Sequence, residues 1–282
     1  MNWPDNLVEE IAYRRCIVFL GAGISASSHD EEGNTPLCWG DFVNNIKEIS
    51  QLSVEDRKFV DEKITQNDFL MALQVIFDNC DKGVYSKFLK DCYLRHTYEP
   101  SELHKIIYDL DSKITITTNF DKIYDKLFLS DAYTKFDYTR TSDIIASIKA
   151  PENVLIKAHG DIDSTEKIIF TAKDYAKCSQ QYPEFYSLLS ALFLTHTVIF
   201  LGYSLNDPDI NLILRQLKKT SSDFCPHYLV TKSGNIEAVK LYWRDVYNVS
   251  VLEYGTEHEE LEIVLNDLRE KVLDLREKRS MP

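Results

Sequence analysis

Two strand-like runs end in side chains that could transfer a proton and hold a polar substrate. Residues 113–118 are rich in β-branched side chains and lead into Asn119 and Asp121. Residues 153–158 form a second such run, which leads directly into His159. Histidine is the side chain best suited to act as a base near neutral pH. We therefore interpret His159 as a general base, Asn119 as a group that holds the substrate, and Asp121 as a third catalytic candidate.

Small residues follow two further apolar runs, at 16–20 and 197–201, and they suit the phosphates or ribose of a ligand. Glycine lets the backbone turn sharply and approach a bound group. Free N–H groups at the start of a helix attract anions, and a serine hydroxyl can bind the same groups. The small residues in question are Gly21, Ala22, Gly23, Ser25, Gly202 and Ser204.

The four runs that precede these residues have the pattern of buried parallel strands. Continuous apolar runs, rather than alternating ones, are typical of strands covered on both faces. Ligands of open α/β sheets bind beyond the carboxyl ends of the strands, so polar residues there gather at one edge. We predict an α/β fold with a parallel sheet of about six strands and helices on both faces. Strands are expected at 16–20, 113–118, 153–158, 197–201, 227–230 and 249–252, and a short one at 167–170.

The long stretch 41–110 has a helical pattern throughout. One crossover between neighbouring strands requires far less chain than this. We predict a helical subdomain inserted into the α/β core, with a cleft between the two. The core would comprise about 10–40 and 111–255, and a helix over 256–279 would complete a single domain of residues 1–282.

The charge of the chain argues against nucleic-acid binding. Its formal net charge is −13, whereas proteins that bind a phosphate backbone carry clustered Lys and Arg. No run of about 18 apolar residues occurs, so we expect no membrane span. The N-terminus lacks a charged-then-apolar leader, so we expect a cytoplasmic protein. The six cysteines show no zinc-knuckle spacing, so we expect them to be reduced and expect no metal site.

Structural explanations stay open for several of these residues. A tight turn without a ligand explains the first glycine stretch about as well, because Ala26 stands where the dinucleotide fingerprint has a third glycine. Asp121 could cap the following helix as readily as it could act on a substrate. Asp207 precedes a proline, a pair that fits a helix start better than a ligand contact. Asp161 could orient the nearby histidine, but we favour a capping role.

The order and spacing of four motifs resemble the sirtuin superfamily, whose members consume NAD. The resemblance is carried by residues 15–28, 113–121, 154–160 and 197–209. In sirtuins a Gly-Ala-Gly-x-Ser turn binds NAD phosphates, a Thr-Gln-Asn-x-Asp segment contacts the nicotinamide ribose, a His-Gly pair supplies the base, and a Gly-x-Ser strand end holds the cofactor. The resemblance implies a Rossmann-like core with Asn119, Asp121 and His159 as catalytic residues. It implies that NAD is bound by Gly21, Ala22, Gly23, Ser25, Thr118, Gly202, Ser204 and Asp207.

The sequence departs from typical sirtuins at three places. Thr118 stands where they have glutamine, their zinc-binding cysteine quartet is absent, and Pro36-x-x-Trp39 occupies a loop that carries an arginine in them. Together with residues 171–175 and 206–210, these departures resemble the divergent bacterial sirtuin-like domains of anti-phage defence systems. Members of that group characteristically hydrolyse NAD rather than deacylate protein, and a second component controls them.

The resemblance therefore implies an NAD glycohydrolase that releases nicotinamide and ADP-ribose, and that depletes cellular NAD as a defence effector when activated. A sensor domain does not fit into this length, so we expect a homo-oligomer or a separate regulatory partner such as a HerA-type ATPase. Two alternatives stay open. A non-catalytic sensor of NAD or ADP-ribose would need neither Asn119 nor His159, and an NAD-dependent protein deacylase normally needs the missing zinc module.

Overall fold

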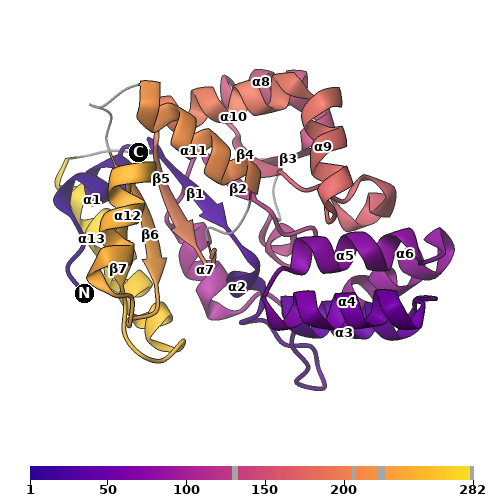
Figure 1. Ribbon diagram of the computed structural model, residues 1–282. Coiled ribbons are helices and arrows are strands. Elements are labelled where there is room, and N and C mark those ends of the chain that lie inside the picture. The colour runs from indigo at the N-terminus through magenta and orange to yellow at the C-terminus, as the bar shows by residue number, and fades with distance from the viewer. Residues whose placement is uncertain (129–132, 205–207, 221–225, 280–282) are drawn as a thin grey trace.

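A parallel sheet of seven strands forms the centre of the computed structural model, which describes residues 1–128, 133–204, 208–220 and 226–279 (Figure 1). The strand order across the sheet is β3-β4-β2-β1-β5-β6-β7, and every neighbouring pair is parallel. The strands are β1 Cys16–Leu20, β2 Ile114–Thr117, β3 Tyr133–Asp137, β4 Asn153–Lys157, β5 Thr197–Leu201, β6 His227–Thr231 and β7 Val249–Glu253.

The burial of the strands explains which of them the sequence predicted. All residues of β1, β2, β4 and β5 are buried, in agreement with their largely apolar and β-branched composition. The edge strand β3 is only half-buried and mixes polar with aromatic residues, so it gave no such run. The prediction of a strand at 167–170 is wrong. Residues 168–170 follow the 3₁₀ segment η4 (Ile162–Lys167), and they are apolar because they pack into the two hydrophobic clusters beside it.

Helices cover both faces of the sheet, as predicted (Figure 1). On one face, α1 (Asp5–Ala12), α7 (Glu102–Asp109) and α13 (Glu260–Lys278) share a hydrophobic cluster with β1. On the other face, the covering helices are α8 (Thr141–Ile148), α9 (Ala172–Gln181), α10 (Pro183–Thr195), α11 (Pro208–Thr220) and α12 (Glu237–Tyr247). The core of the molecule therefore consists of two apolar layers with the sheet between them.

A third hydrophobic cluster lies beside the sheet. It is built by α3 (Trp39–Ile49), α4 (Val54–Thr65), α5 (Phe69–Asp78) and α6 (Lys82–Lys90), together with Ile162, Ile168 and Phe170. The π-helical turn η1 (Asp91–Arg95) follows α6. Within the range 41–110, α7 differs from these helices because it packs against α13 on the core. The division of the chain into a core and an insertion stays a prediction.

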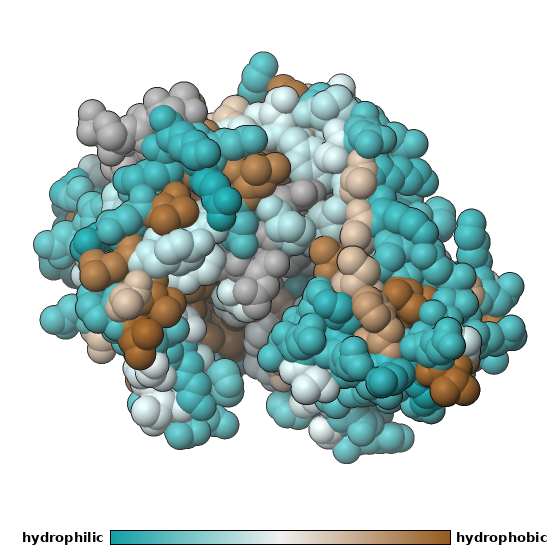
Figure 2. All heavy atoms as spheres, viewed as in Figure 1, coloured by the Kyte–Doolittle hydropathy of each residue, from teal (hydrophilic) through white to brown (hydrophobic). Residues whose placement is uncertain are grey.

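Figure 2 shows a mostly hydrophilic surface that is hollowed at its lower edge, between the sheet with its helices and the group α3–α6. The short helix α2 (Ala22–Ser25), which follows β1, lies between these two parts in Figure 1. Within the part of the chain that the structure describes, no helix combines the length and the apolar character needed to cross a membrane.

Candidate active site

The four strands whose ends carry the predicted motifs are consecutive in the sheet, in the order β4-β2-β1-β5. Their last residues are also in register: Leu20 pairs with Thr117 and with Leu201, and Thr117 pairs with Lys157. The residues that follow these ends therefore begin at one level along the same edge of the sheet. This is the edge at which open α/β sheets bind their ligands.

Glycines bring the turn after β1 into direct contact with the end of β5. The N–H of Gly21 donates to the carbonyl of Leu201, and the N–H of Gly23 donates to the carbonyl of Gly202, both at 2.9 Å. A Cβ on Gly21 would lie 2.5 Å from the Gly202 oxygen, so no larger residue fits without movement. These two N–H groups bind the protein's own carbonyls, and their predicted contact with phosphate stays a prediction.

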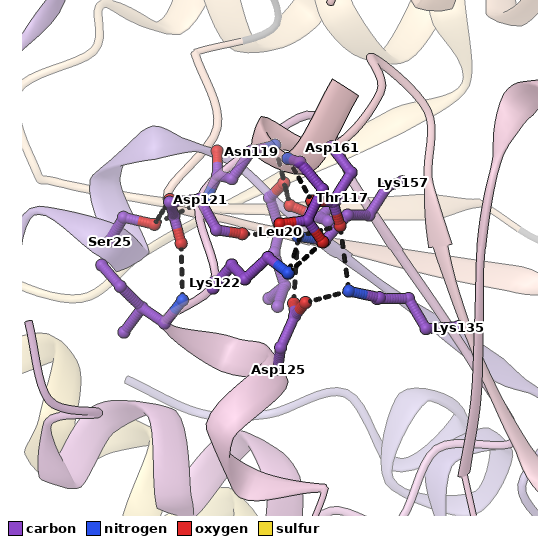
Figure 3. A network of polar contacts seen from close by, with 12 residues as sticks. Leu20, Ser25, Thr117, Asn119, Asp121, Lys122, Asp125, Lys135, Lys157 and Asp161 are labelled. Carbon is purple, nitrogen blue, oxygen red and sulfur yellow. Dashed lines mark hydrogen bonds and ion pairs between the residues drawn. The ribbon is translucent and has the colours of Figure 1, made fainter. Parts of the chain in front are cut away.

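Asn119 joins the turn after β1 to the end of β2 (Figure 3). Its amide nitrogen donates to the carbonyl of Gly21 at 3.0 Å and to the hydroxyl oxygen of Ser25 at 2.9 Å. Ser25 in turn donates its hydroxyl proton to Asp121 at 2.6 Å. Ser25 and Asp121 are both buried, whereas Asn119 is half-buried. The network fixes the Asn119 amide and leaves its carbonyl oxygen as the group that can accept a bond from a ligand.

Asp121 combines a capping role with support for this network. Its second carboxylate oxygen accepts the N–H of Ile123 at 2.9 Å, at the turn that leads into η2 (Tyr124–Leu127). Burial raises the pKa of Asp121, although Lys157, Ser25 and the N–H of Ile123 act in the opposite direction. The carboxyl group therefore faces the protein, and the suggested contact between Asp121 and a substrate stays a prediction.

His159 lies two residues beyond the end of β4 and is half-buried. Its Nε2 lies 3.5 Å from the hydroxyl of Tyr175 on α9, and the two rings meet edge to face with centroids 5.3 Å apart. Gly160 adopts a φ of +89°, and a Cβ there would lie 2.7 Å from the Lys167 carbonyl oxygen. The glycine thus allows the chain to turn immediately after the histidine. Tyr175 was missed as a site residue, although it ends the stretch 171–175 that carried part of the resemblance.

The remaining predicted ligand-binding residues differ in their surroundings. The N–H of Thr118 donates to the carbonyl of Leu20 at 3.3 Å, which continues the pairing of β1 and β2. Ala22 and Ser204 are exposed and can be reached by a ligand. Asp207 lies outside the described residues. Sequence reasoning missed Thr117, whose buried hydroxyl donates to the Leu20 carbonyl and accepts the N–H of Asn119, both at 3.0 Å.

A cluster of lysines and aspartates adjoins the end of β4 and the segment that follows β2 (Figure 3). Lys157, the last residue of β4, is 1% exposed and pairs with Asp125 and Asp161, at 3.1 Å in each case. Asp161 also accepts the N–H of Asp163 at 3.0 Å and so caps η4, as predicted. Burial alone would raise the pKa of Asp161, but Lys157, this N–H and Lys135 outweigh it and lower the pKa to about 2.

Two surface hollows adjoin this region. One is lined by residues that include Lys135, Arg140 and Asp161, and the other by residues that include Tyr138 and Asp174. Neither lining includes Asn119 or His159. Among the described residues, no group of three or more His, Cys, Asp or Glu side chains is placed to hold a metal ion. The candidate site is therefore defined by the strand-end residues.

Part of the sequence matches a known protein family. Residues 113–252 match the sequence model of the SIR2-like domain. The chain carries a SIR2-like domain. The matched range includes the ends of β2, β4 and β5, with Asn119, His159 and Gly202. The glycine turn after β1 precedes this range, and Asn119 ties it to the matched part through the Gly21 carbonyl.

Three curated bacterial proteins are similar to most of this chain. The protein named "NAD(+) hydrolase ThsA" from Enterococcus faecium is 26% identical over 253 residues, which cover 85% of this chain and 48% of the relative. "Defense-associated sirtuin 2" from Bacillus subtilis is 22% identical over 85% of this chain and 23% of its own length. A second "NAD(+) hydrolase ThsA", from Acinetobacter baumannii (strain 532279), is 25% identical over 76% of this chain and 41% of its own. The chain thus spans less than half the length of these relatives.

Proposed function

We propose that this chain hydrolyses NAD to nicotinamide and ADP-ribose at the carboxyl ends of β1, β2, β4 and β5. The observation that carries the proposal is the bonding of Asn119 to both Gly21 and Ser25. These bonds join the glycine turn to the SIR2-like segment at the edge where α/β sheets bind ligands. The names of the relatives support NAD as the substrate.

The proposed reaction breaks the bond between nicotinamide and C1 of its ribose. The bonding electrons pass to the ring nitrogen, so nicotinamide leaves as a neutral molecule without needing an acid. The ribose becomes oxocarbenium-like, as in glycoside hydrolysis, and water adds to C1. His159 accepts a proton from that water. The carbonyl oxygen of Asn119 orients the ribose or the water, and such positioning accounts for a large part of the rate in this type of reaction.

The other residues of the site hold the catalytic groups or the substrate in place. Ser25 and Asp121 hold the Asn119 amide in its orientation. The exposed Ala22 and Ser204 border the site and would contact the phosphates and ribose of NAD. We further propose that the protein depletes NAD as a cytoplasmic defence effector, and that a homo-oligomer or a regulatory partner such as a HerA-type ATPase controls it.

Two variants test the assignment of the site. Purified protein is incubated with NAD, and nicotinamide and ADP-ribose are separated by chromatography. We expect His159→Ala and Asn119→Ala each to lose at least about 100-fold in turnover, which is the size of a missing general base or positioning group. Circular dichroism and urea unfolding establish that each variant is folded.

The matched control is His258→Ala. His258 is exposed and lies beyond β7, at the opposite end of the sheet from β4. We expect this variant to keep the turnover of the unmodified chain. Folded His159→Ala and Asn119→Ala proteins that retain turnover would remove the assignment. NAD binding without cleavage by the unmodified protein would favour the sensor, and cleavage only with an acyl-lysine peptide would favour the deacylase.

A further inference from the structure

Lys157 is a buried cation whose ammonium group meets three acceptors. Its Nζ lies 3.1 Å from a carboxylate oxygen of Asp125 and 3.1 Å from one of Asp161, and it donates a hydrogen bond to the main-chain carbonyl of Asp121. An ammonium group has three protons and no acceptor capacity. One hydrogen bond and two ion pairs therefore surround the group, and such pairing is what the burial of a charge requires.

The position of Lys157 links the two candidate catalytic loops. It is the last residue of β4, two residues before His159, and the carbonyl that it binds lies two residues after Asn119. The preceding carbonyl, that of Phe120, accepts the N–H of Ile162 at 2.9 Å. Two consecutive carbonyls of the Asn119 loop are thus held by the segment that contains His159.

We propose that Lys157 is a positioning residue that fixes the Asn119 loop against the His159 loop. The inference rests on the proposed NAD hydrolysis, because it assigns Lys157 a task in that reaction. At 1% exposure Lys157 does not reach a substrate, so it acts through the two loops. A buried ion cluster gives little net stability compared with apolar packing of the same volume. Three acceptors that converge on one ammonium group do, however, define a single geometry for the loops that supply them.

Lys135 supplies the matched control. Its Nζ lies 2.6 Å from Asp125 and 3.0 Å from Asp161, so it pairs with the same two carboxylates as Lys157. Its side chain is one-third exposed, and its contacts among the described residues are with carboxylates rather than with carbonyls of the Asn119 loop. Removing Lys135 therefore perturbs the charge balance of the cluster and leaves the bond to the Asp121 carbonyl in place.

The test compares Lys157→Met with Lys135→Met in turnover and in folding stability. We expect Lys157→Met to lower kcat for NAD about 100-fold, the effect of displacing a reacting group by roughly 1 Å. We expect the KM to change much less, and Lys135→Met to keep most of the kcat. A double variant, Lys157→Met/Asp125→Asn, removes one negative charge along with the positive one. It should recover stability towards urea without recovering kcat, and it carries the test if Lys157→Met alone does not fold.

Hydrogen exchange keeps this inference distinguishable from the proposed function. The amide of Ile162 donates to Phe120, so its exchange reports whether the two loops are joined. We expect faster exchange at Ile162 in Lys157→Met than in Lys135→Met, whether or not the unmodified protein cleaves NAD. Equal exchange in the two variants would overturn the inference. A kcat that recovers together with stability in the double variant would also overturn it, because Lys157 would then serve stability alone.

Discussion

Replacing Gly202 with alanine tests the close contact on which the site is built. Gly202 has a φ of +60°, in the left-handed region, and a Cβ there would lie 2.5 Å from the backbone nitrogen of Ile24. The left-handed backbone costs a residue with a Cβ about 1–2 kcal/mol. Forcing a methyl group into a filled space adds about 1–3 kcal/mol. We therefore expect Gly202→Ala to lower the free energy of unfolding by about 2–5 kcal/mol, with a loss of NAD turnover.

Gly33 separates the two contributions. Its φ is +84°, but a Cβ there would meet no atom within 4 Å. Gly33→Ala should therefore show only the backbone contribution of about 1–2 kcal/mol, reduced by the lower entropy of the unfolded chain. Urea unfolding of both variants measures the difference. Equal losses of stability in Gly202→Ala and Gly33→Ala would refute the close approach of the turn after β1 to the end of β5.

Three further perturbations test the buried polar groups. Ser25→Ala removes the hydroxyl that donates to buried Asp121 and accepts from Asn119. It should lower the free energy of unfolding, measured with urea, by about 1–3 kcal/mol. A decrease below roughly 0.5 kcal/mol, the size found at an ordinary surface site, would contradict this. Burial lowers the pKa of His104 to about 4. Between pH about 6.5 and 4 the unfolded chain therefore binds one more proton than the folded chain, so the free energy of unfolding decreases as the pH falls. His104→Gln should remove about 1.4 kcal/mol per pH unit from that slope, and an unchanged slope would argue against the neutral buried histidine. The pKa of Asp161 is lowered to about 2, so its stabilisation is present above pH about 4 and disappears towards pH 2. Asp161→Asn should abolish this acid-dependent loss of about 2 kcal/mol, measured by unfolding at pH 2–5.

The sequence predicted the central strands because the amino-acid composition of these strands reflects their burial. Strands β1, β2, β4 and β5 are buried on both faces, and apolar or β-branched residues fill most of their positions. Strand β3 lies at the edge of the sheet and is half-buried, so its Tyr-Thr-Lys-Phe-Asp composition resembles that of a surface segment. At residues 168–170 a strand was predicted where there is none, because these residues are apolar through side-chain packing rather than through strand pairing.

The location of the candidate site followed from the same reasoning, but its internal contacts did not. Polar residues after buried parallel strands had to gather at one edge, which placed Asn119 near the glycine turn. That Ser25 donates to Asp121 depends on side-chain rotamers and on the register between strands, which no local pattern specifies. The sequence pattern predicts Lys157 only as a residue of a strand. Its role depends on three acceptors from other loops, and those loops come together only in the folded chain.

NAD cleavage by the purified chain tests the central claim most directly. Binding of NAD is measured by calorimetry, and the amounts of nicotinamide and ADP-ribose are measured after incubation without any acyl-lysine peptide. We predict that the two products form in equal amounts from the unmodified chain and that His159→Ala binds NAD without releasing either. NAD that is bound by the unmodified chain but recovered intact would contradict the proposed hydrolysis.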